Sequence, residues 1–271
     1  MNLPSTSEFI KKYQLDAKKS LGQNFILDKN FTDKIVKSAG DLNDQYILEI
    51  GPGPGSLTRS ILDHDIKKLI VVEKDQRCLN ILQEIKQFHS KLEIIAQDAL
   101  DINEADLFKE NKFKIIANLP YNIATILIFK WLRILQNITS MTLMVQKEVA
   151  QRITAKVGDK NYGRLSVMIN YLCHSKINFI VSNSVFKPRP KVMSAIIELK
   201  PKVNEINLAE FKRLENITAI AFNQRRKMLK KSLQRSFKEP SLILEKLNID
   251  DKLRPEDLTI EQFVKIANYR E

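Results

Sequence analysis

The sequence predicts an α/β fold, in which a parallel sheet with helices on both faces is followed by a small C-terminal helical domain. Short apolar runs alternate with helical spacings from Tyr46 to about residue 156, which is the pattern of a parallel sheet. A glycine-dense turn at residues 51–55 separates the first strand of this series from its first helix. Beyond Pro201 the spacings are helical to the end. We therefore expect a sheet domain of residues 1-202 and a helical domain of residues 203-271.

The composition is that of a globular protein with a polyanionic partner. Charged residues make up 28% of the 271 residues and apolar residues 44%. No apolar run approaches the roughly 20 residues of a membrane span, and the first residues lack the apolar core of a signal peptide, so we expect a cytoplasmic protein with no membrane partner. The formal net charge of +12 indicates a partner such as a nucleic acid.

Cysteine and histidine are too sparse to indicate a disulfide framework or a metal site. Cys78 and Cys173 are the two cysteines, and neither lies in a metal-ligand spacing. The histidines His64, His89 and His174 are scattered singly along the chain. We therefore expect no bound metal.

The expected elements follow in order from the N-terminus. A basic lead-in reaches a segment at residues 20–28 that we expect to pack on the sheet as an arm. The expected strands are Tyr46–Ile50, Leu69–Glu73, Leu92–Ala96, Ile115–Asn118 and Met141–Val145. The helices between them are expected near Leu57–Leu62, Gln76–Gln87, Ala124–Leu135 and Lys147–Lys156.

After residue 175 the pattern changes. Two extended runs, Lys176–Val181 and Val192–Leu199, leave no room for a helix between them and predict an antiparallel pair that closes the sheet. Their connection contains a stiff basic loop at residues 186–191. The later helices are expected at Leu208–Arg235, Ser241–Leu247 and Ile260–Asn268.

The glycine-dense turn predicts a site for an adenosine-type ligand. Gly51 and Gly53 allow the backbone to approach a ligand closely. Glu73 ends the next strand, at roughly the 20-residue distance where such folds place an acid that binds a ribose. Pro52 and Pro54 have no N–H to offer a pyrophosphate, so a cofactor without phosphates, such as S-adenosylmethionine, suits this loop. If the segment were an ordinary turn, the position of Glu73 would be a coincidence.

Several polar residues and glycines lie at or just past the ends of the expected strands. They are Glu49, Gly51, Glu73, Asp98 and Asn118. Ligands of open α/β sheets bind beyond the carboxyl ends of the strands, so we expect these residues to meet at one crevice.

The tetrapeptide Asn118-Leu119-Pro120-Tyr121 favours methyl transfer to N6 of an adenine. That nitrogen is a poor nucleophile because its lone pair is delocalised into the purine ring. The side-chain carbonyl of Asn118 and a backbone carbonyl of Leu119 or Pro120 can accept its two hydrogens, which steers the lone pair out of the plane. Tyr121 can stack on a base that has been flipped out of its helix. Alone the tetrapeptide could be a strand-end turn, but its position beside the glycine-rich loop favours the functional interpretation.

Six motifs in order resemble those of the rRNA adenine N6-dimethyltransferase family, and in particular its small-subunit (16S) branch. They are Leu21-Gly22-Gln23-Asn24-Phe25, Glu49-Ile50-Gly51-Pro52-Gly53, Val72-Glu73-Lys74-Asp75, Gln97-Asp98-Ala99, Asn118-Leu119-Pro120-Tyr121-Asn122 and Phe186-Lys187-Pro188-Arg189-Pro190-Lys191-Val192. The resemblance implies a Rossmann-like class I S-adenosylmethionine-dependent methyltransferase sheet. It also implies a substrate of two adjacent adenines in the 3′-terminal hairpin loop of 16S rRNA, each methylated twice during small-subunit assembly. We expect a monomer.

The resemblance assigns roles to single residues. One group would bind the cofactor: Asn24 and Ile26 from the arm, Gly51 at its methionine part with Gly53 in the same loop, Glu73 at the ribose hydroxyls, Asp98 with Ala99 at the adenine amino group, and Asn118 between cofactor and target. A second group would hold the target base: Asn118, Leu119 and Pro120 at its edge, and Tyr121 and Phe186 stacked on its two faces.

A basic run predicts the RNA-binding surface of the helical domain. Between Asn223 and Lys238 there are seven basic residues and no acidic ones. An apolar stripe at helical spacing (Phe222, Leu229, Leu233 and Phe237) would turn these basic residues outward. A run of one sign favours a phosphate-binding face over a merely solvated one. The expected RNA contacts are Arg225, Arg226, Lys227, Lys230 and Lys231, together with Lys187, Arg189 and Lys191 of the basic loop.

Three alternatives remain open. A large-subunit rRNA adenine methyltransferase of the macrolide-resistance type would share the fold, the cofactor and the base pocket. A non-catalytic ribosome-assembly or transcription factor could use the same scaffold, but the intact tetrapeptide at Asn118 speaks against it. A dehydrogenase is disfavoured by the two prolines of the loop.

Overall fold

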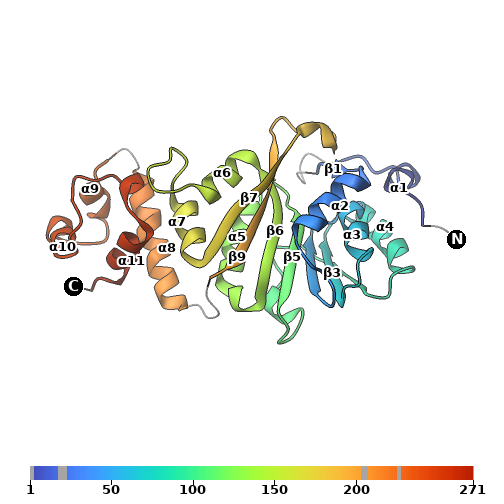
Figure 1. Ribbon diagram of the computed structural model, residues 1–271, viewed down its shortest axis with the longest axis horizontal. Coiled ribbons are helices and arrows are strands. Elements are labelled where there is room, and N and C mark those ends of the chain that lie inside the picture. The colour runs from blue at the N-terminus through green and yellow to red at the C-terminus, as the bar shows by residue number, and fades with distance from the viewer. Residues whose placement is uncertain (1–2, 18–22, 203–206, 225–226, 271) are drawn as a thin grey trace. The chain divides into compact units, whose positions relative to one another are not determined.

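The computed structural model describes residues 3–17, 23–202, 207–224 and 227–270. In these residues a seven-stranded sheet has the order β4-β3-β2-β5-β6-β9-β7, and a small sheet pairs β1 (Phe25–Ile26) antiparallel with β8 (Phe186–Lys187) (Figure 1). The strands of the large sheet are β2 (Tyr46–Ile50), β3 (Lys68–Glu73), β4 (Leu92–Ala96), β5 (Phe113–Asn118), β6 (Ile138–Gln146), β7 (Cys173–Val181) and β9 (Ser194–Pro201).

The five strands from β4 to β6 pair in parallel, and this arrangement positions the site. The strand β9 pairs antiparallel with β6, and β7 lies beyond it at the edge of the sheet. The predicted parallel sheet is thus present, and the two extended runs predicted after residue 175 are its last strands. Because carboxyl ends of parallel strands lie at the same edge, Glu49, Glu73 and Asn118 are brought to the same side.

The parallel strands form because their apolar residues are covered on both faces. Ile47, Leu48 and Ile50 of β2 are all nearly or fully buried, as expected for a strand between two helical layers. Helices α3 (Ser56–Leu62) and α4 (Gln76–Lys86) pack against β3, and α2 (Lys29–Ser38) packs on α3 (Figure 1).

Two of these helices begin at side-chain caps that the sequence contains. The carboxylate of Asp28 accepts the N–H of Asn30 at the start of α2, and that of Asp75 accepts the N–H of Arg77 at the start of α4. Helix α3 instead begins at Gly55, whose φ of 80° favours glycine. A Cβ on Gly55 would lie 2.5 Å from the Cδ1 of Ile85 on α4, so a larger residue would also require the Ile85 side chain to move.

The N-terminal arm is a folded part of the sheet unit. Helix α1 (Thr6–Lys12) begins at a capping box between Ser5 and Glu8, and it buries Phe9. The arm then joins the hydrophobic core through Leu15, Phe25 and Ile26. The part of the arm at residues 18–22 lies outside the described residues.

The chain divides into two compact units, which differ in one segment from the expected ranges. Unit one comprises residues 1–150 with 176–201, and unit two comprises residues 151–175 with 202–271. The expected boundary near residue 202 coincides with this division, but the segment 151–175, expected in the sheet domain, groups with the helices. Tyr162 gives the physical reason: it is buried, its hydroxyl donates to the carbonyl of Leu258 at 3.0 Å, and its ring packs edge-on against Phe222.

Unit two holds one helix that the sequence did not predict. Helix α7 (Arg164–Leu172) packs on α8 (Leu208–Asn223), and α11 (Ile260–Asn268) packs on both.

The remaining α-helices of the described chain are α5 (Ala124–Trp131), which continues as a 3₁₀ turn Leu132–Asn137, α6 (Lys147–Thr154), α9 (Leu229–Leu233) and α10 (Pro240–Lys246).

The prediction of one continuous helix over residues 208–235 is wrong, because α8 ends at Asn223 and α9 begins at Leu229. The N–H of Leu229 donates to the carbonyl of Leu253 at 2.7 Å, which a continuous helix would not allow. Leu229 and Leu233 are buried, as the apolar stripe predicted, but they belong to a separate helix that packs on α10.

Candidate active site

A pocket opens at the carboxyl ends of β2, β3 and β5, with residues of the N-terminal arm on one wall. Nearly all the residues predicted for cofactor and base lie in its lining: Asn24, Ile26, Gly51, Gly53, Glu73, Asp98, Ala99, Asn118, Leu119, Pro120 and Tyr121. Gln23, Glu49 and Lys74 line it as well. The crevice predicted from strand ends is therefore present.

Two glycines of the turn make room at the centre of this pocket. Gly51 and Gly53 have φ values of 66° and 55°. A Cβ on Gly53 would lie 3.3 Å from the ring of Phe25, so the arm can rest on the loop only because that residue is glycine. A Cβ on Gly51 would reach the ring of Pro120 at 3.5 Å, so the glycine loop and the tetrapeptide lie against each other.

Glu73 is held by the backbone of two turns. Its Oε1 accepts the N–H groups of Lys74 and Asp75 at 2.8 and 2.9 Å, and its Oε2 accepts that of Gly53 at 3.1 Å. Burial raises the pKa of this carboxyl, and the three N–H groups oppose that effect. A carboxylate has about four acceptor sites, so Glu73 can still accept a hydroxyl of a ligand.

Glu49 is a second acid of the pocket and is almost fully buried. The hydroxyl of Thr58 donates to its Oε2 at 2.7 Å. Burial raises the pKa of Glu49 to about 8, and the nearby Glu73 adds to the shift. Glu49 is thus largely protonated near neutral pH, which limits the negative charge beside Glu73.

Asp98 remains charged at the mouth of the pocket. Its Oδ1 accepts the N–H of Leu100 at 3.0 Å, and Lys74 donates to its Oδ2 at 2.9 Å. These two bonds lower the pKa of Asp98. Lys74 was not predicted as a site residue, although it stands next to Glu73 in the same motif.

Asn118 ends β5 with its amide in a defined orientation. Its Nδ2 donates to the backbone carbonyl of Asn24 at 3.4 Å, so its carbonyl oxygen is left to accept from a ligand. The carbonyl of Pro120 already accepts the N–H groups of Ile123 and Ala124 at the start of α5. Among the two backbone acceptors that the sequence left open, this arrangement favours Leu119.

Tyr121 is fixed from a distant part of the chain. Its hydroxyl lies 2.6 Å from the Oγ of Ser194, which is fully buried on β9. Ser194 was not predicted as a site residue, because 73 positions separate it from Tyr121 and no local motif marks it.

Phe186 does not join this group in the structure. It pairs with Ile26 between β8 and β1, is 3% exposed, and belongs to the hydrophobic core. It is not among the residues that line the pocket. The stacking position expected opposite Tyr121 is therefore not formed here, because the small sheet draws the ring into the core.

The predicted RNA-binding residues differ in their surroundings. Lys187, Arg189, Lys191, Lys227 and Lys231 are exposed, as expected. Lys230 is half-buried and forms an ion pair with Asp251 at 2.8 Å, so it is partly a structural residue of unit two. Arg225 and Arg226 lie outside the described residues.

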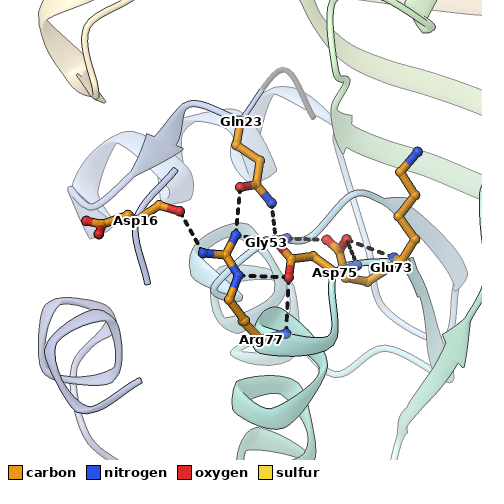
Figure 2. Close-up of polar contacts among 7 residues, drawn as sticks. Asp16, Gln23, Gly53, Glu73, Asp75 and Arg77 are labelled. Carbon is orange, nitrogen blue, oxygen red and sulfur yellow. Dashed lines mark hydrogen bonds and ion pairs between the residues drawn. The ribbon is translucent and has the colours of Figure 1, made fainter. Parts of the chain in front are cut away.

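A polar network beside Glu73 was not predicted. Asp75 is almost fully buried and binds both Arg77 and Gln23, and Arg77 also reaches the backbone of Asp16, as Figure 2 shows. The network thus joins the turn after β3 to the N-terminal arm.

Two features are absent from the part of the chain that the structure describes. Among its residues, no group of three or more His, Cys, Asp or Glu side chains could hold a metal ion. Across the same part of the chain, no helix is long and apolar enough to cross a membrane.

Comparisons with known proteins show the family of the chain. The model of a family described as "Ribosomal RNA adenine dimethylase" matches residues 14–271. The chain is 45% identical to the ribosomal RNA small subunit methyltransferase A of Agrobacterium fabrum, over 98% of this chain and 97% of that protein. It is 43% identical to the protein of the same name from Afipia carboxidovorans, over 98% of this chain and 96% of that one.

Two solved structures share the fold. A dimethyladenosine transferase from Plasmodium falciparum superposes with a TM-score of 0.76 at 28% identity, covering 89% of this chain and 95% of the other. The 23S rRNA methyltransferase ErmE superposes with a TM-score of 0.68 at 26% identity, covering 90% and 98%. The α/β sheet with a C-terminal helical region is thus the fold of RNA-modifying methyltransferases.

Proposed function

This chain belongs to the ribosomal RNA adenine dimethylase family, and from that premise we propose its reaction in detail. It transfers methyl groups from S-adenosylmethionine to N6 of two adjacent adenines in the 3′-terminal hairpin loop of 16S rRNA. The products are N6,N6-dimethyladenosines, formed during assembly of the small subunit. The observation that carries the proposal is the convergence of Glu73, Asp98 and Asn118 on one pocket.

The pocket fits a methyl donor that has a ribose and no phosphates. Glu73 is oriented by three backbone N–H groups and can accept a ribose hydroxyl. Asp98 can accept a hydrogen bond from the amino group of the donor's adenine, and the buried Ala99 lies beside it in the sequence. Pro52 and Pro54 leave the loop short of donors for a pyrophosphate. When bound, the donor supplies an electrophilic methyl group.

The arm and the turn complete the donor site. Asn24 and Ile26 cover it from the arm, and Gly51 and Gly53 give the space for its methionine part. Lys74 donates to one oxygen of Asp98 and the N–H of Leu100 donates to the other, and each carboxylate oxygen can accept one further hydrogen bond.

The target nitrogen would be activated by hydrogen-bond acceptors. The Asn118 carbonyl and the backbone carbonyl of Leu119 would accept the two N6 hydrogens, and Pro120 would fix the backbone between them. N6 then becomes pyramidal, and its lone pair is no longer conjugated with the ring and points to the methyl carbon. The methylated nitrogen is a cation that loses its proton to water, so no strong base is needed, and alignment contributes most. Tyr121, held by Ser194, would stack on the flipped base.

Sequence identity to known proteins favours the small-subunit substrate over the large-subunit substrate. The relatives named for the small subunit have clearly higher identity to this chain than ErmE, whose name gives 23S rRNA. A non-catalytic assembly factor is disfavoured, since the acceptors and acids of the pocket are all in place. The substrate implies a cytoplasmic enzyme that works on the assembling subunit, and we propose that it does so as a monomer.

The proposal is tested by transfer of labelled methyl groups from S-adenosylmethionine to small subunits that lack the modification. Nucleoside analysis of the product should give N6,N6-dimethyladenosine in 16S rRNA and no label in large subunits offered in parallel. Label found in 23S rRNA alone would identify the large-subunit enzyme instead. Binding of RNA without any transfer would support the assembly-factor alternative.

A further inference from the structure

One guanidinium holds the N-terminal arm at two points. Arg77, on the first turn of α4, donates from Nη1 to the backbone carbonyl of Asp16 at 2.9 Å. Its Nη2 lies 3.5 Å from the Oε1 of Gln23. Gln23 and Asp16 both belong to the arm, so a single side chain of the sheet unit fixes two parts of it (Figure 2).

Arg77 is itself fixed by a buried carboxylate. Its Nη2 and Nε donate to the two oxygens of Asp75 at 2.6 and 3.0 Å, which is a two-oxygen fork. The side chain of Asp75 is 4% exposed and that of Arg77 28%, so the pair is shielded from solvent screening. Asp75 also accepts the side-chain N–H of Gln23 at 2.9 Å.

The same turn carries Glu73, the acid placed at the ribose. The N–H of Asp75 donates to the Oε1 of Glu73, and the two carboxylates therefore have fixed positions relative to each other. On the arm side, Gln23 is followed by Asn24, which lines the pocket and accepts from Asn118. A change in the position of Gln23 would move the wall of the pocket.

We propose that Arg77, with Asp75, is a positioning residue that sets the affinity for the methyl donor by holding Gln23 and Asn24 in place beside it. Neither Asp75 nor Arg77 lines the pocket, so their effect is indirect. The inference rests on the proposed function, because the ligand is the donor named there.

Apolar packing alone does not give this position. Phe9 and Leu15 anchor the first part of the arm in the core, and Lys12 with Tyr13 bonds to Glu84 further along α4. These contacts keep α1 on the sheet unit. Gln23 itself bonds to Asp75 and Arg77, and the residues after it are held by the packing of Phe25 on Gly53 and by the pairing of β1 with β8.

The test compares Arg77→Gln with Glu84→Gln, a matched variant that removes an arm contact of the same helix remote from the pocket. Calorimetry with S-adenosylmethionine should give a Kd about tenfold weaker for Arg77→Gln, equal to about 1.4 kcal/mol, and an unchanged Kd for Glu84→Gln. At saturating donor, kcat should stay within about twofold of the unchanged protein, because Arg77 does not touch the reacting groups.

A second measurement needs no ligand. Hydrogen exchange of the peptide that carries residues 23–26 should be faster in Arg77→Gln and unchanged in Glu84→Gln. Arg77→Lys, which keeps the charge but cannot form the fork, should behave like Arg77→Gln and serves if that variant does not fold.

The outcomes separate the two proposals. An unchanged Kd together with unchanged exchange in a folded Arg77 variant overturns the positioning role. A lower kcat at unchanged Kd overturns it as well. Failure of the unchanged protein to bind S-adenosylmethionine overturns the proposed function, and the exchange result alone then decides whether Arg77 holds the arm.

Discussion

The side-chain nitrogen of Asn118 donates to the backbone carbonyl oxygen of Asn24 at 3.4 Å. This contact joins the end of β5 to the N-terminal arm and decides which end of the Asn118 amide faces a ligand. The carbonyl oxygen is the end that can accept a hydrogen from an adenine amino group. The arm therefore contributes to the active site through its backbone as well as through its side chains.

Replacement of Asn118 by alanine should abolish most turnover and leave RNA affinity intact. The acceptor acts mainly in the transition state, so kcat should fall on the order of a hundredfold or more, as when one preorganised hydrogen-bonding group is removed. Single-turnover methyl transfer and RNA-binding titrations measure the two effects. A raised KM at normal kcat would show that Asn118 only positions the substrate.

Replacement of Glu73 by alanine should weaken donor binding far more than RNA binding. Each charge-assisted bond to a ribose hydroxyl contributes about 1.5–3 kcal/mol. Calorimetry with S-adenosylmethionine should show the loss, and circular dichroism should show an intact fold. If the Kd for the donor is unchanged in a folded variant, Glu73 does not bind the ribose.

Glu49 should make folding stability depend on pH. Its pKa is raised by burial from an ordinary value near 4.5 to about 8 in the folded protein, so the folded state holds a proton that the unfolded state releases. The stability from the protonated form is fully present below about pH 4.5 and is lost as pH rises toward 8, by up to about 1.4 kcal/mol per unit.

Urea unfolding of the unchanged protein and of Glu49→Gln at several pH values measures this effect. The variant cannot ionise at that position. Its free energy of unfolding, relative to that of the unchanged protein, should therefore rise between pH 5 and about 8 and then level off. A difference that stays constant over this range would show that Glu49 is ionised in the folded state.

Replacement of Phe186 by alanine should lower the free energy of unfolding, because the ring is part of the core. The ring is almost fully buried between β8 and the core, and loss of such a ring costs about 3–5 kcal/mol. Phe186→Leu should keep most of the stability. If Phe186→Leu is stable but transfers methyl groups poorly to an RNA it still binds, the ring does stack on the target base when RNA is present.

Two adjacent lysines of α9 offer a matched test of the RNA-binding surface. Lys231 is exposed, whereas Lys230 pairs with Asp251. Lys231→Gln should reduce the slope of log affinity against log salt concentration by roughly 0.7–0.9. Lys230→Gln should reduce this slope less and should instead lower the melting temperature.

The basic loop extends that test. Replacing Lys187, Arg189 and Lys191 together by glutamine should flatten the same plot by roughly 0.7–0.9 for each lost phosphate contact, with donor affinity unchanged. Equal slopes for the unchanged protein and all three variants would mean that the RNA contacts lie elsewhere on the chain.

The sequence alone determined the sheet, its strand ends and most of the pocket. The apolar runs, the glycines with positive φ and the strand-end acids are local signals, because a strand's burial and a turn's geometry depend on neighbouring residues. Gly51, Glu73 and Asn118 could be placed at one crevice because parallel strands end at a common edge. The family motifs added Asn24 and Ile26 to the same set.

Only the tertiary structure decided how distant segments meet. The bond of Tyr121 to Ser194, the bond of Gln23 to Asp75, the burial of Phe186 against Ile26 and the grouping of Tyr162 with Leu258 all join residues far apart in the chain. No local pattern encodes such contacts, because each depends on packing that forms when the strands and helices assemble. For the same reason the break between α8 and α9 was missed: the N–H of Leu229 finds its acceptor at Leu253, which helical spacing cannot reveal.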